Sequence, residues 1–303
     1  MNLPGLILPL ATPFSDDKLD LGALKANLET YESVGVHGYL AMGSSGEAVM
    51  LDESEKIEML KLIRAAVPGD RPLIAGTGME STPATIRLTK LAADAGANFA
   101  LVSVPFYYRS QMTEQVIVRH YGKVAKASPI PILLYHAPQF TRIQFSLSLV
   151  GKLAEFDNIA GVKDSGGNID WLGNVPLRVP EDFEILCGNA RIFEAGLQKG
   201  ATGGVLAAGN IFPEVFRKIY DKAKAGKGPE AGELQAKISG PAMLLGTQQG
   251  IAGLKAAMDL RGLRGGDPRL PLVPLDEGTK QQYKRELEKL VKEDVIASLT
   301  LKD

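Results

Sequence analysis

The stretch "DAGANFALVSVP" (residues 94–105) contains the local pattern that decides the fold of this chain. Gly96 follows the end of an expected helix, and a mostly apolar run begins at Phe99. Glycine readily takes the left-handed conformation that ends a helix. A continuous apolar run is typical of a parallel strand that is covered on both faces. The stretch therefore predicts a helix followed by a buried parallel strand.

The same unit recurs, with Gly35 in "SVGVHGYL" and Gly200 in "QKGATGGV" at the matching point. Strand-like runs return at intervals of roughly thirty residues along the chain. The expected strands cover residues 5–14, 37–44, 72–78, 98–105, 131–138, 159–165, 183–189 and 202–210. Eight strands that alternate with helices predict an α/β fold of the (β/α)8 TIM-barrel type. An open doubly wound sheet is the alternative, but no G-x-G-x-x-G motif follows the first strand.

Helix signals lie between the strands. Asp52, with Glu55 three residues later, predicts a capping box, and Thr82 followed by Pro83 predicts a second helix start. After about residue 212 the sequence contains helical patterns and no further strand. We therefore predict a barrel domain over residues 1–225. The remaining residues, 226–303, are expected to form a C-terminal helical extension.

The composition narrows the possible partners. Lys and Arg total 34 against 35 for Asp and Glu, so nothing favours a nucleic acid or an anionic membrane as partner. The single cysteine, Cys187, excludes an intrachain disulfide and predicts a reducing compartment, for which we expect the cytoplasm. The start, "MNLPGLILPLATPF", lacks a basic region and contains prolines, so it is expected to be a strand rather than a signal peptide.

The stretch "NIAGVKDSGGN" (158–168) places Lys163 at the end of a predicted strand. Functional residues of a barrel of this kind lie at the carboxyl ends of the strands. Burial lowers the pKa of a lysine, and the neutral amine can then attack a carbonyl carbon and form a Schiff base. An ion pair with Asp164 or another neighbouring residue is the alternative interpretation of Lys163.

Two further motifs follow neighbouring predicted strands. Tyr135 in "YHAP" can move protons, although an isolated tyrosine is more often a core residue with a satisfied hydroxyl. The backbone N–H groups of "GSSGE" (43–47), with the hydroxyls of Ser44 and Ser45, can hold a carboxylate. Such a loop on its own is more often just a turn. Glu47 is expected to fix this loop rather than to take part in chemistry.

Other candidates carry less weight. His37, His120 and His136 lack the spacing of metal ligands, so no metal site is predicted. No phosphate-binding G-x-x-x-x-G-K-[ST] motif is present, and no cofactor is expected. Cys187 is expected to pack against its neighbours rather than to act as a nucleophile.

Together, "GSSGE", "YHAP" and "GVKDS" resemble, in order and spacing, the dihydrodipicolinate synthase and N-acetylneuraminate lyase family of pyruvate-dependent class I aldolases. The resemblance implies a barrel with a helical extension, assembled as a homotetramer of two tight dimers. It implies pyruvate and a small aldehyde or 2-oxo acid as substrates, without a metal or a diffusible cofactor.

The resemblance also implies roles for single residues. Lys163 matches the Schiff-base lysine, and Tyr135 matches the proton-transferring tyrosine. Ser44 and Ser45 match the pair that holds the ketoacid carboxylate, and Ser44 also matches the hydroxyl of the proton relay. Tyr107 matches the tyrosine that reaches a neighbouring subunit's site. Positions that match the lining of the pyruvyl pocket are Gly188 and Val205.

The aldehyde end of the site separates the branches of the family. In the synthases an arginine that binds the aldehyde's carboxylate follows the "Y-N-x-P" motif; here Phe140 stands at that place and Arg142 follows two residues later. "PFYYRSQM", "GVKDSGGN" and "GIAGLKAAMDLRGLRGG" are similar to 4-hydroxy-2-oxoglutarate aldolase, where Ser165 fits a substrate-contacting hydroxyl. We therefore predict cleavage of a 4-hydroxy-2-oxo acid to pyruvate and an aldehyde. The first candidate substrates are 4-hydroxy-2-oxoglutarate, which yields glyoxylate, and a 2-keto-3-deoxy sugar acid.

The sequence leaves three alternatives open. One is a dihydrodipicolinate synthase that condenses pyruvate with aspartate semialdehyde. Another is a sugar-acid dehydratase that uses the same imine chemistry. The third belongs to a different class, a non-catalytic barrel that binds a ketoacid.

Overall fold

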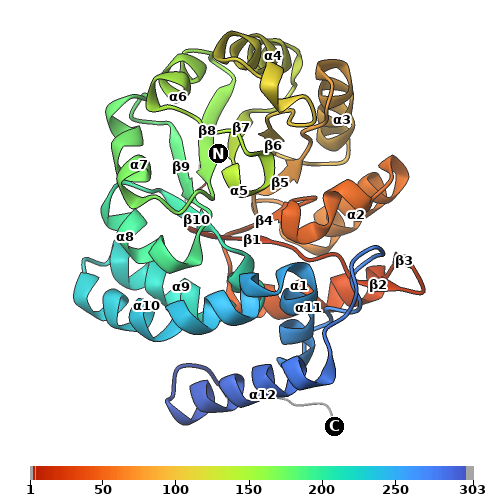
Figure 1. Ribbon diagram of the computed structural model, residues 1–303, viewed down its shortest axis with the longest axis vertical. Coiled ribbons are helices and arrows are strands. Elements are labelled where there is room, and N and C mark those ends of the chain that lie inside the picture. The colour runs from red at the N-terminus through yellow and green to blue at the C-terminus, as the bar shows by residue number, and fades with distance from the viewer. Residues whose placement is uncertain (1–2, 4, 298–303) are drawn as a thin grey trace.

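The computed structural model describes Leu3 and residues 5–297. Eight parallel strands close into a barrel in the hydrogen-bonded order β1-β10-β9-β8-β7-β6-β5-β4, as Figure 1 shows. The barrel strands are β1 (Gly5–Pro9), β4 (Gly38–Ala41), β5 (Leu73–Gly76), β6 (Phe99–Ser103), β7 (Ile132–His136), β8 (Ile159–Asp164), β9 (Glu184–Cys187) and β10 (Gly203–Val205). Successive strands in the chain are neighbours in the barrel, so the connecting helices lie outside it. The predicted (β/α)8 barrel is confirmed.

Eight helices connect or close the barrel. They are α1 (Leu21–Val34), α2 (Glu53–Ala66), α3 (Thr82–Asp94), α4 (Glu114–Ala127), α6 (Leu147–Ala154), α7 (Ile169–Asn174), α8 (Phe193–Gln198) and α9 (Pro213–Lys224). The Asp52 capping box before α2 is present with both of its hydrogen bonds. At α3 the predicted cap is wrong by one residue, because the side chain of Ser81 accepts the capping bond and Thr82 is already helical. Positive φ values confirm the predicted helix-ending glycines Gly35, Gly96 and Gly200.

The first strand is shorter than its apolar run predicts. Strand β1 ends at Pro9, and Phe14 belongs instead to β2 (Phe14–Ser15), which pairs with β3 (Lys18–Leu19) in an antiparallel hairpin. The run misleads because Leu10 and Ala11, beyond the end of the strand, are also buried. Hydrophobicity therefore continues into the mouth of the barrel after the ladder hydrogen bonds have stopped.

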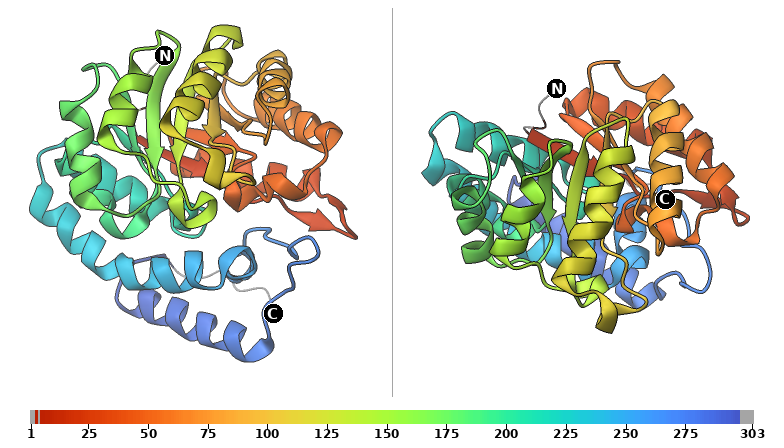
Figure 2. Two further views of the ribbon diagram at one scale, coloured as in Figure 1. Left: turned by 45° about the horizontal axis from the view of Figure 1, so that its top comes forward. Right: turned by 90° about the horizontal axis from the view of Figure 1, so that it is seen from above.

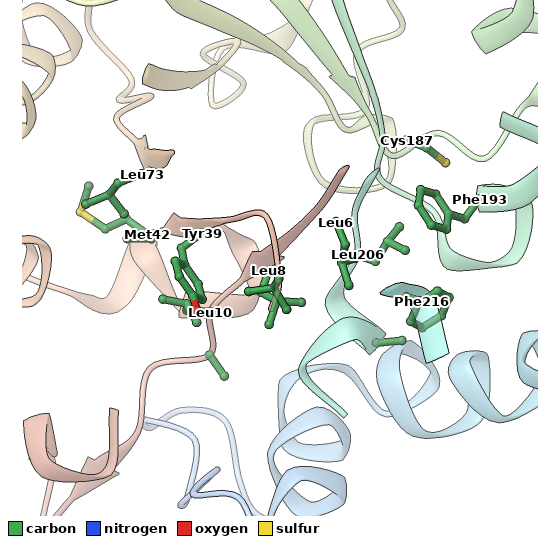
Figure 3. Close-up of a cluster of buried hydrophobic side chains, with 14 of the residues drawn as sticks. Leu6, Leu8, Leu10, Tyr39, Met42, Leu73, Cys187, Phe193, Leu206 and Phe216 are labelled. Carbon is green, nitrogen blue, oxygen red and sulfur yellow. The ribbon is translucent and has the colours of Figure 1, made fainter. Parts of the chain in front are cut away.

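Side chains alternate between two apolar layers. Ile7 of β1 lies in the cluster inside the barrel, whereas Leu6 and Leu8 lie in the larger cluster between the sheet and the helices. Figure 3 shows this outer layer, which also contains Cys187 and Phe193. Burial raises the pKa of the Cys187 thiol to about 12, which agrees with packing rather than nucleophilic chemistry.

The chain after α9 forms a helical layer along one side of the barrel (Figure 2). It contains α10 (Gly228–Met243), a π-helical turn (Leu244–Gln248), α11 (Gly250–Leu260) and α12 (Glu277–Lys292). The predicted boundary between residues 225 and 226 stays a prediction, and 298–303 lie outside the described residues. Over residue 3 and residues 5–297, no helix has both the length and the apolar character needed to span a membrane.

Candidate active site

Tyr135 and Lys163 lie side by side at the carboxyl ends of two neighbouring strands. They are direct partners in the register between β7 and β8, so their side chains leave the sheet at the same height on the same face. Lys163 Nζ lies 4.5 Å from the centroid of the Tyr135 ring. The closed barrel thus brings together two residues that the sequence places on separate strands.

Lys163 is buried, with 5% of its surface exposed. No carboxylate forms an ion pair with it in the part of the chain that the structure describes. Burial lowers the pKa of the Lys163 ammonium group, and the neighbouring Tyr135 opposes this shift only in part. The arrangement favours a neutral amine, which is the nucleophilic form of lysine.

Asp164 points away from Lys163 and pairs with a histidine instead. Oδ1 of Asp164 lies 2.7 Å from Nδ1 of His136, and both side chains are almost fully buried. The alternative that Lys163 pairs with Asp164 is therefore wrong. Lys163 and Asp164 are successive residues of β8, and successive side chains of a strand point to opposite faces of the sheet, so the two cannot pair.

His136 joins the two loops that follow β7 and β8. Its Nε2 lies 3.0 Å from Oε1 of Gln144, and its ring packs against those of Phe145 and Trp171. Trp171 in turn donates a hydrogen bond from Nε1 to the carbonyl of Phe145. This role of His136 was not predicted from the sequence, where the histidines were considered only as metal ligands. The signal was present, since His136 and Asp164 each follow a predicted site residue on adjacent strands.

The "GSSGE" loop follows β4 and reaches Tyr135. The hydroxyls of Ser44 and Tyr135 share a hydrogen bond of 3.2 Å. Ser45 is half-buried in the same turn. Both Met42 and Glu47, at the two ends of the loop, have left-handed φ angles of 57° and 54°. Such a conformation costs a non-glycine residue on the order of 1 kcal/mol, and it persists only where the surrounding structure imposes it.

Ser165 and Gly188 meet at the ends of β8 and β9. The N–H of Gly188 donates to the carbonyl of Asp164 at 2.6 Å. A Cβ atom at position 188 would collide with the Ser165 hydroxyl, so only glycine leaves that hydroxyl in its present place. Val205 is buried in the inner cluster that also contains Tyr135.

Two predicted site residues lie at the surface of the single chain. Tyr107 is 76% exposed, and its ring contacts that of Tyr108 edge to face. Its predicted place in a neighbouring subunit's site stays a prediction. Phe140 is 56% exposed on α5 (Pro138–Thr141), directly after β7. Arg142, which follows α5, is also exposed.

Across the described residues, no group of three or more His, Cys, Asp or Glu side chains is arranged to hold a metal ion. Besides the buried His136–Asp164 pair, the polar groups gathered at this end of the barrel include an amine, a phenol and serine hydroxyls. Fold and site together define a (β/α)8 barrel with a lysine-centred site at the carboxyl ends of its strands.

The family model described as the Dihydrodipicolinate synthetase family matches residues 2–290, and this chain belongs to that family. Its members are class I pyruvate-dependent lyases and synthases that act through a Schiff base, and the chain is accordingly an enzyme of this kind. The membership confirms the predicted resemblance at the level of the family.

Individual relatives cover nearly the whole chain. An uncharacterized DapA-like lyase of Halobacterium salinarum is 34% identical over 95% of this chain and 94% of its own. The 4-hydroxy-tetrahydrodipicolinate synthase of Methanopyrus kandleri is 32% identical over 95% of this chain and 97% of its own. The crystal structure of the chloride-inhibited dihydrodipicolinate synthase from Acinetobacter baumannii, complexed with pyruvate, superposes with a TM-score of 0.89. That structure is 29% identical and covers 95% of this chain and 98% of its own.

Proposed function

We propose that this enzyme cleaves a 4-hydroxy-2-oxo acid to pyruvate and an aldehyde through a Schiff base on Lys163. The observation that carries the proposal is the pair at the ends of β7 and β8. A buried lysine, which has no carboxylate partner among the described residues, stands beside Tyr135, whose hydroxyl meets that of Ser44. An amine that attacks a carbonyl needs a nearby proton donor and acceptor, and Tyr135 and Ser44 supply such a relay.

The first half of the reaction forms the imine. The substrate carboxylate docks on the hydroxyls and N–H groups of the Ser44–Ser45 loop, which directs the 2-oxo carbon toward Lys163. The neutral amine of Lys163 attacks that carbon to give a carbinolamine. Tyr135 then protonates the carbinolamine hydroxyl, which leaves as water. The product is an iminium ion that carries the positive charge.

The second half breaks the carbon–carbon bond. Tyr135 takes the proton of the C4 hydroxyl, the C3–C4 bond breaks, and its electron pair passes into the iminium to give an enamine. The aldehyde departs, C3 of the enamine is protonated, and water releases pyruvate from Lys163. The iminium itself accepts the electrons, so the scheme needs no metal or diffusible cofactor. Tyr107 of a neighbouring subunit completes the proton relay in the homotetramer that we propose, which we expect to work in the cytoplasm.

Phe140 supports the choice of an aldolase over a synthase. An aromatic ring cannot make the charge-assisted hydrogen bonds that an arginine makes to an aldehyde's carboxylate. The Ser165 hydroxyl, for which Gly188 leaves room, is available to contact a shorter aldehyde such as glyoxylate. The second candidate is 4-hydroxy-tetrahydrodipicolinate synthase, which the names of several relatives favour.

An aldehyde panel separates the candidates. The enzyme is incubated with pyruvate and either glyoxylate, aspartate semialdehyde or a sugar-derived aldehyde, and the products are identified by mass. We expect the highest kcat/KM with glyoxylate; faster turnover of aspartate semialdehyde would establish the synthase. Binding of pyruvate without turnover of any aldehyde would support a non-catalytic barrel.

Two matched variants sharpen this comparison. Phe140→Arg restores the arginine of the synthases and should raise the rate with aspartate semialdehyde relative to glyoxylate. Arg142→Ala tests whether the exposed Arg142 binds the carboxylate of the aldehyde instead. We expect Arg142→Ala to leave the ratio of the two rates unchanged.

A further inference from the structure

A buried ion pair connects the candidate carboxylate-binding loop to the C-terminal helical extension. Oε1 of Glu47, the last residue of the "GSSGE" loop, lies 2.6 Å from Nζ of Lys255 on α11. The Glu47 and Lys255 side chains are 1% and 0% exposed. Neither residue has a role in the proposed reaction, although the pair adjoins Ser44 and Ser45.

Further bonds tie both partners to the segment between α11 and α12. Oε2 of Glu47 accepts a hydrogen bond of 2.9 Å from the N–H of Arg269. Nζ of Lys255 donates to the carbonyl of Asp267 at 2.9 Å. The guanidinium group of Arg269 also donates to the carbonyl of Met50, just beyond the loop. In Figure 1 this segment lies beside the β2–β3 hairpin, where the ring of Phe14 packs under the cationic groups of Lys255 and Arg269.

The segment passes so close to α11 that its path is fixed. A Cβ atom at Gly265 would collide with the carbonyl of Lys255, so only glycine permits this approach. The N–H of Gly265 donates to Oδ1 of Asp259 at 2.7 Å. The side chain of Lys255 is therefore confined between α11 and this segment, with its ammonium group directed at Glu47.

We propose that Glu47 and Lys255 are positioning residues that hold the Ser44–Ser45 loop in the shape that binds the substrate carboxylate. The C-terminal extension then belongs to the substrate site. The inference rests on the proposed function. It explains how a loop with left-handed Met42 and Glu47 keeps that strained conformation, because strain persists only where the surroundings over-determine it.

Charge distinguishes this role from packing alone. Apolar side chains of similar volume often stabilise a buried site as well as an ion pair does. The Glu47 carboxylate has two directional partners, Nζ of Lys255 and the N–H of Arg269. Together they fix the orientation of this last residue of the loop as well as its depth in the protein. Loss of Lys255 leaves a buried carboxylate without its counter-ion, and the loop must move to hydrate it.

The test measures binding of pyruvate to the imine-forming enzyme. Wild type, Lys255→Met and the double variant Glu47→Gln/Lys255→Met are trapped with borohydride over a range of pyruvate concentrations. The double variant removes both charges and leaves no unpaired ion, so it folds even if Lys255→Met does not. Arg261→Met is the control, because Arg261 at the end of α11 pairs with Glu214 of α9, and none of its hydrogen bonds among the described residues involves the loop.

We expect the half-saturating pyruvate concentration to rise about tenfold in Lys255→Met, equivalent to about 1.4 kcal/mol of binding free energy. In the double variant we expect this concentration to rise about threefold or more. Arg261→Met should lower the Tm and leave the half-saturating pyruvate concentration unchanged. If Lys255→Met or the double variant folds and has the same half-saturating pyruvate concentration as wild type, the positioning role is overturned, and the proposed function is not affected. Wild type that forms no adduct overturns the proposed function, and the inference with it.

Discussion

Replacement of His136 by alanine is expected to weaken the fold at the aldehyde end of the site. The substitution removes the partner that lies 2.7 Å from Oδ1 of Asp164. The side chains of His136 and Asp164 are only 3% and 1% exposed. It also removes the ring that packs between Phe145 and Trp171. These contacts connect the segment after β7, which includes α5 with Phe140, to α7 after β8.

The size of the effect follows from what Asp164 retains. A buried polar group that loses its hydrogen-bond partner typically costs about 1–3 kcal/mol. Oδ1 of Asp164 keeps the hydrogen bond from the N–H of Gly166 at 3.0 Å, but the ring that packs against Phe145 and Trp171 is lost as well. We therefore expect His136→Ala to reduce the free energy of unfolding by about 3 kcal/mol. His136→Asn keeps a donor for Asp164 and should cost about 1 kcal/mol.

Urea unfolding followed by circular dichroism measures these losses. His120→Ala is the matched control, because His120 is also buried but, within the described part of the chain, its one side-chain hydrogen bond is to the hydroxyl of Thr82. In the aldehyde panel, His136→Ala should raise the KM for the aldehyde more than it raises the half-saturating pyruvate concentration. A loss of stability no larger than that of His120→Ala would refute the argument that the His136–Asp164 pair holds this region together.

Three further predictions concern the chemistry. Tyr135→Phe should lower turnover by about 10²–10⁴, the usual range for a positioned acid–base group, and an unchanged kcat would remove Tyr135 from the relay. Gly188→Ala should cost about 1–3 kcal/mol of stability in a denaturation experiment and raise the KM for the aldehyde, because the new methyl displaces the Ser165 hydroxyl. The rate of imine trapping should rise with pH as the Lys163 ammonium deprotonates. Since burial lowers the pKa of Lys163, this rate should level off below about pH 10.4, the ordinary value for lysine, and a later plateau would contradict the shift.

The barrel was predictable because its strands are covered on both faces. Each strand is then a short apolar run, and three of the helices that precede a strand end near a left-handed glycine, at Gly35, Gly96 and Gly200. The ends of the strands were less predictable. Leu10 lies beyond β1 but is buried, so hydrophobicity alone does not show where the ladder hydrogen bonds stop. Ser81 and Thr82 are both good caps, and the sequence did not separate them.

The candidate site was predictable where a residue lies at the end of a strand. Lys163 and Tyr135 are of this kind, because the barrel topology sets the height of every strand end. The pair formed by Glu47 and Lys255 was not predictable, since it joins a loop to a helix far along the chain. No local pattern records that contact. Glu47 was expected to fix its loop, but its partner emerged only from the packing of α11.

Borohydride trapping in the presence of pyruvate tests directly whether Lys163 forms the imine. The enzyme is reduced with and without pyruvate, digested with a protease, and its peptides are examined by mass spectrometry. We predict one pyruvate-dependent reduced adduct, located on Lys163 and absent from a Lys163→Ala variant. Wild-type enzyme that gives no adduct, or an adduct that persists in Lys163→Ala, would contradict it.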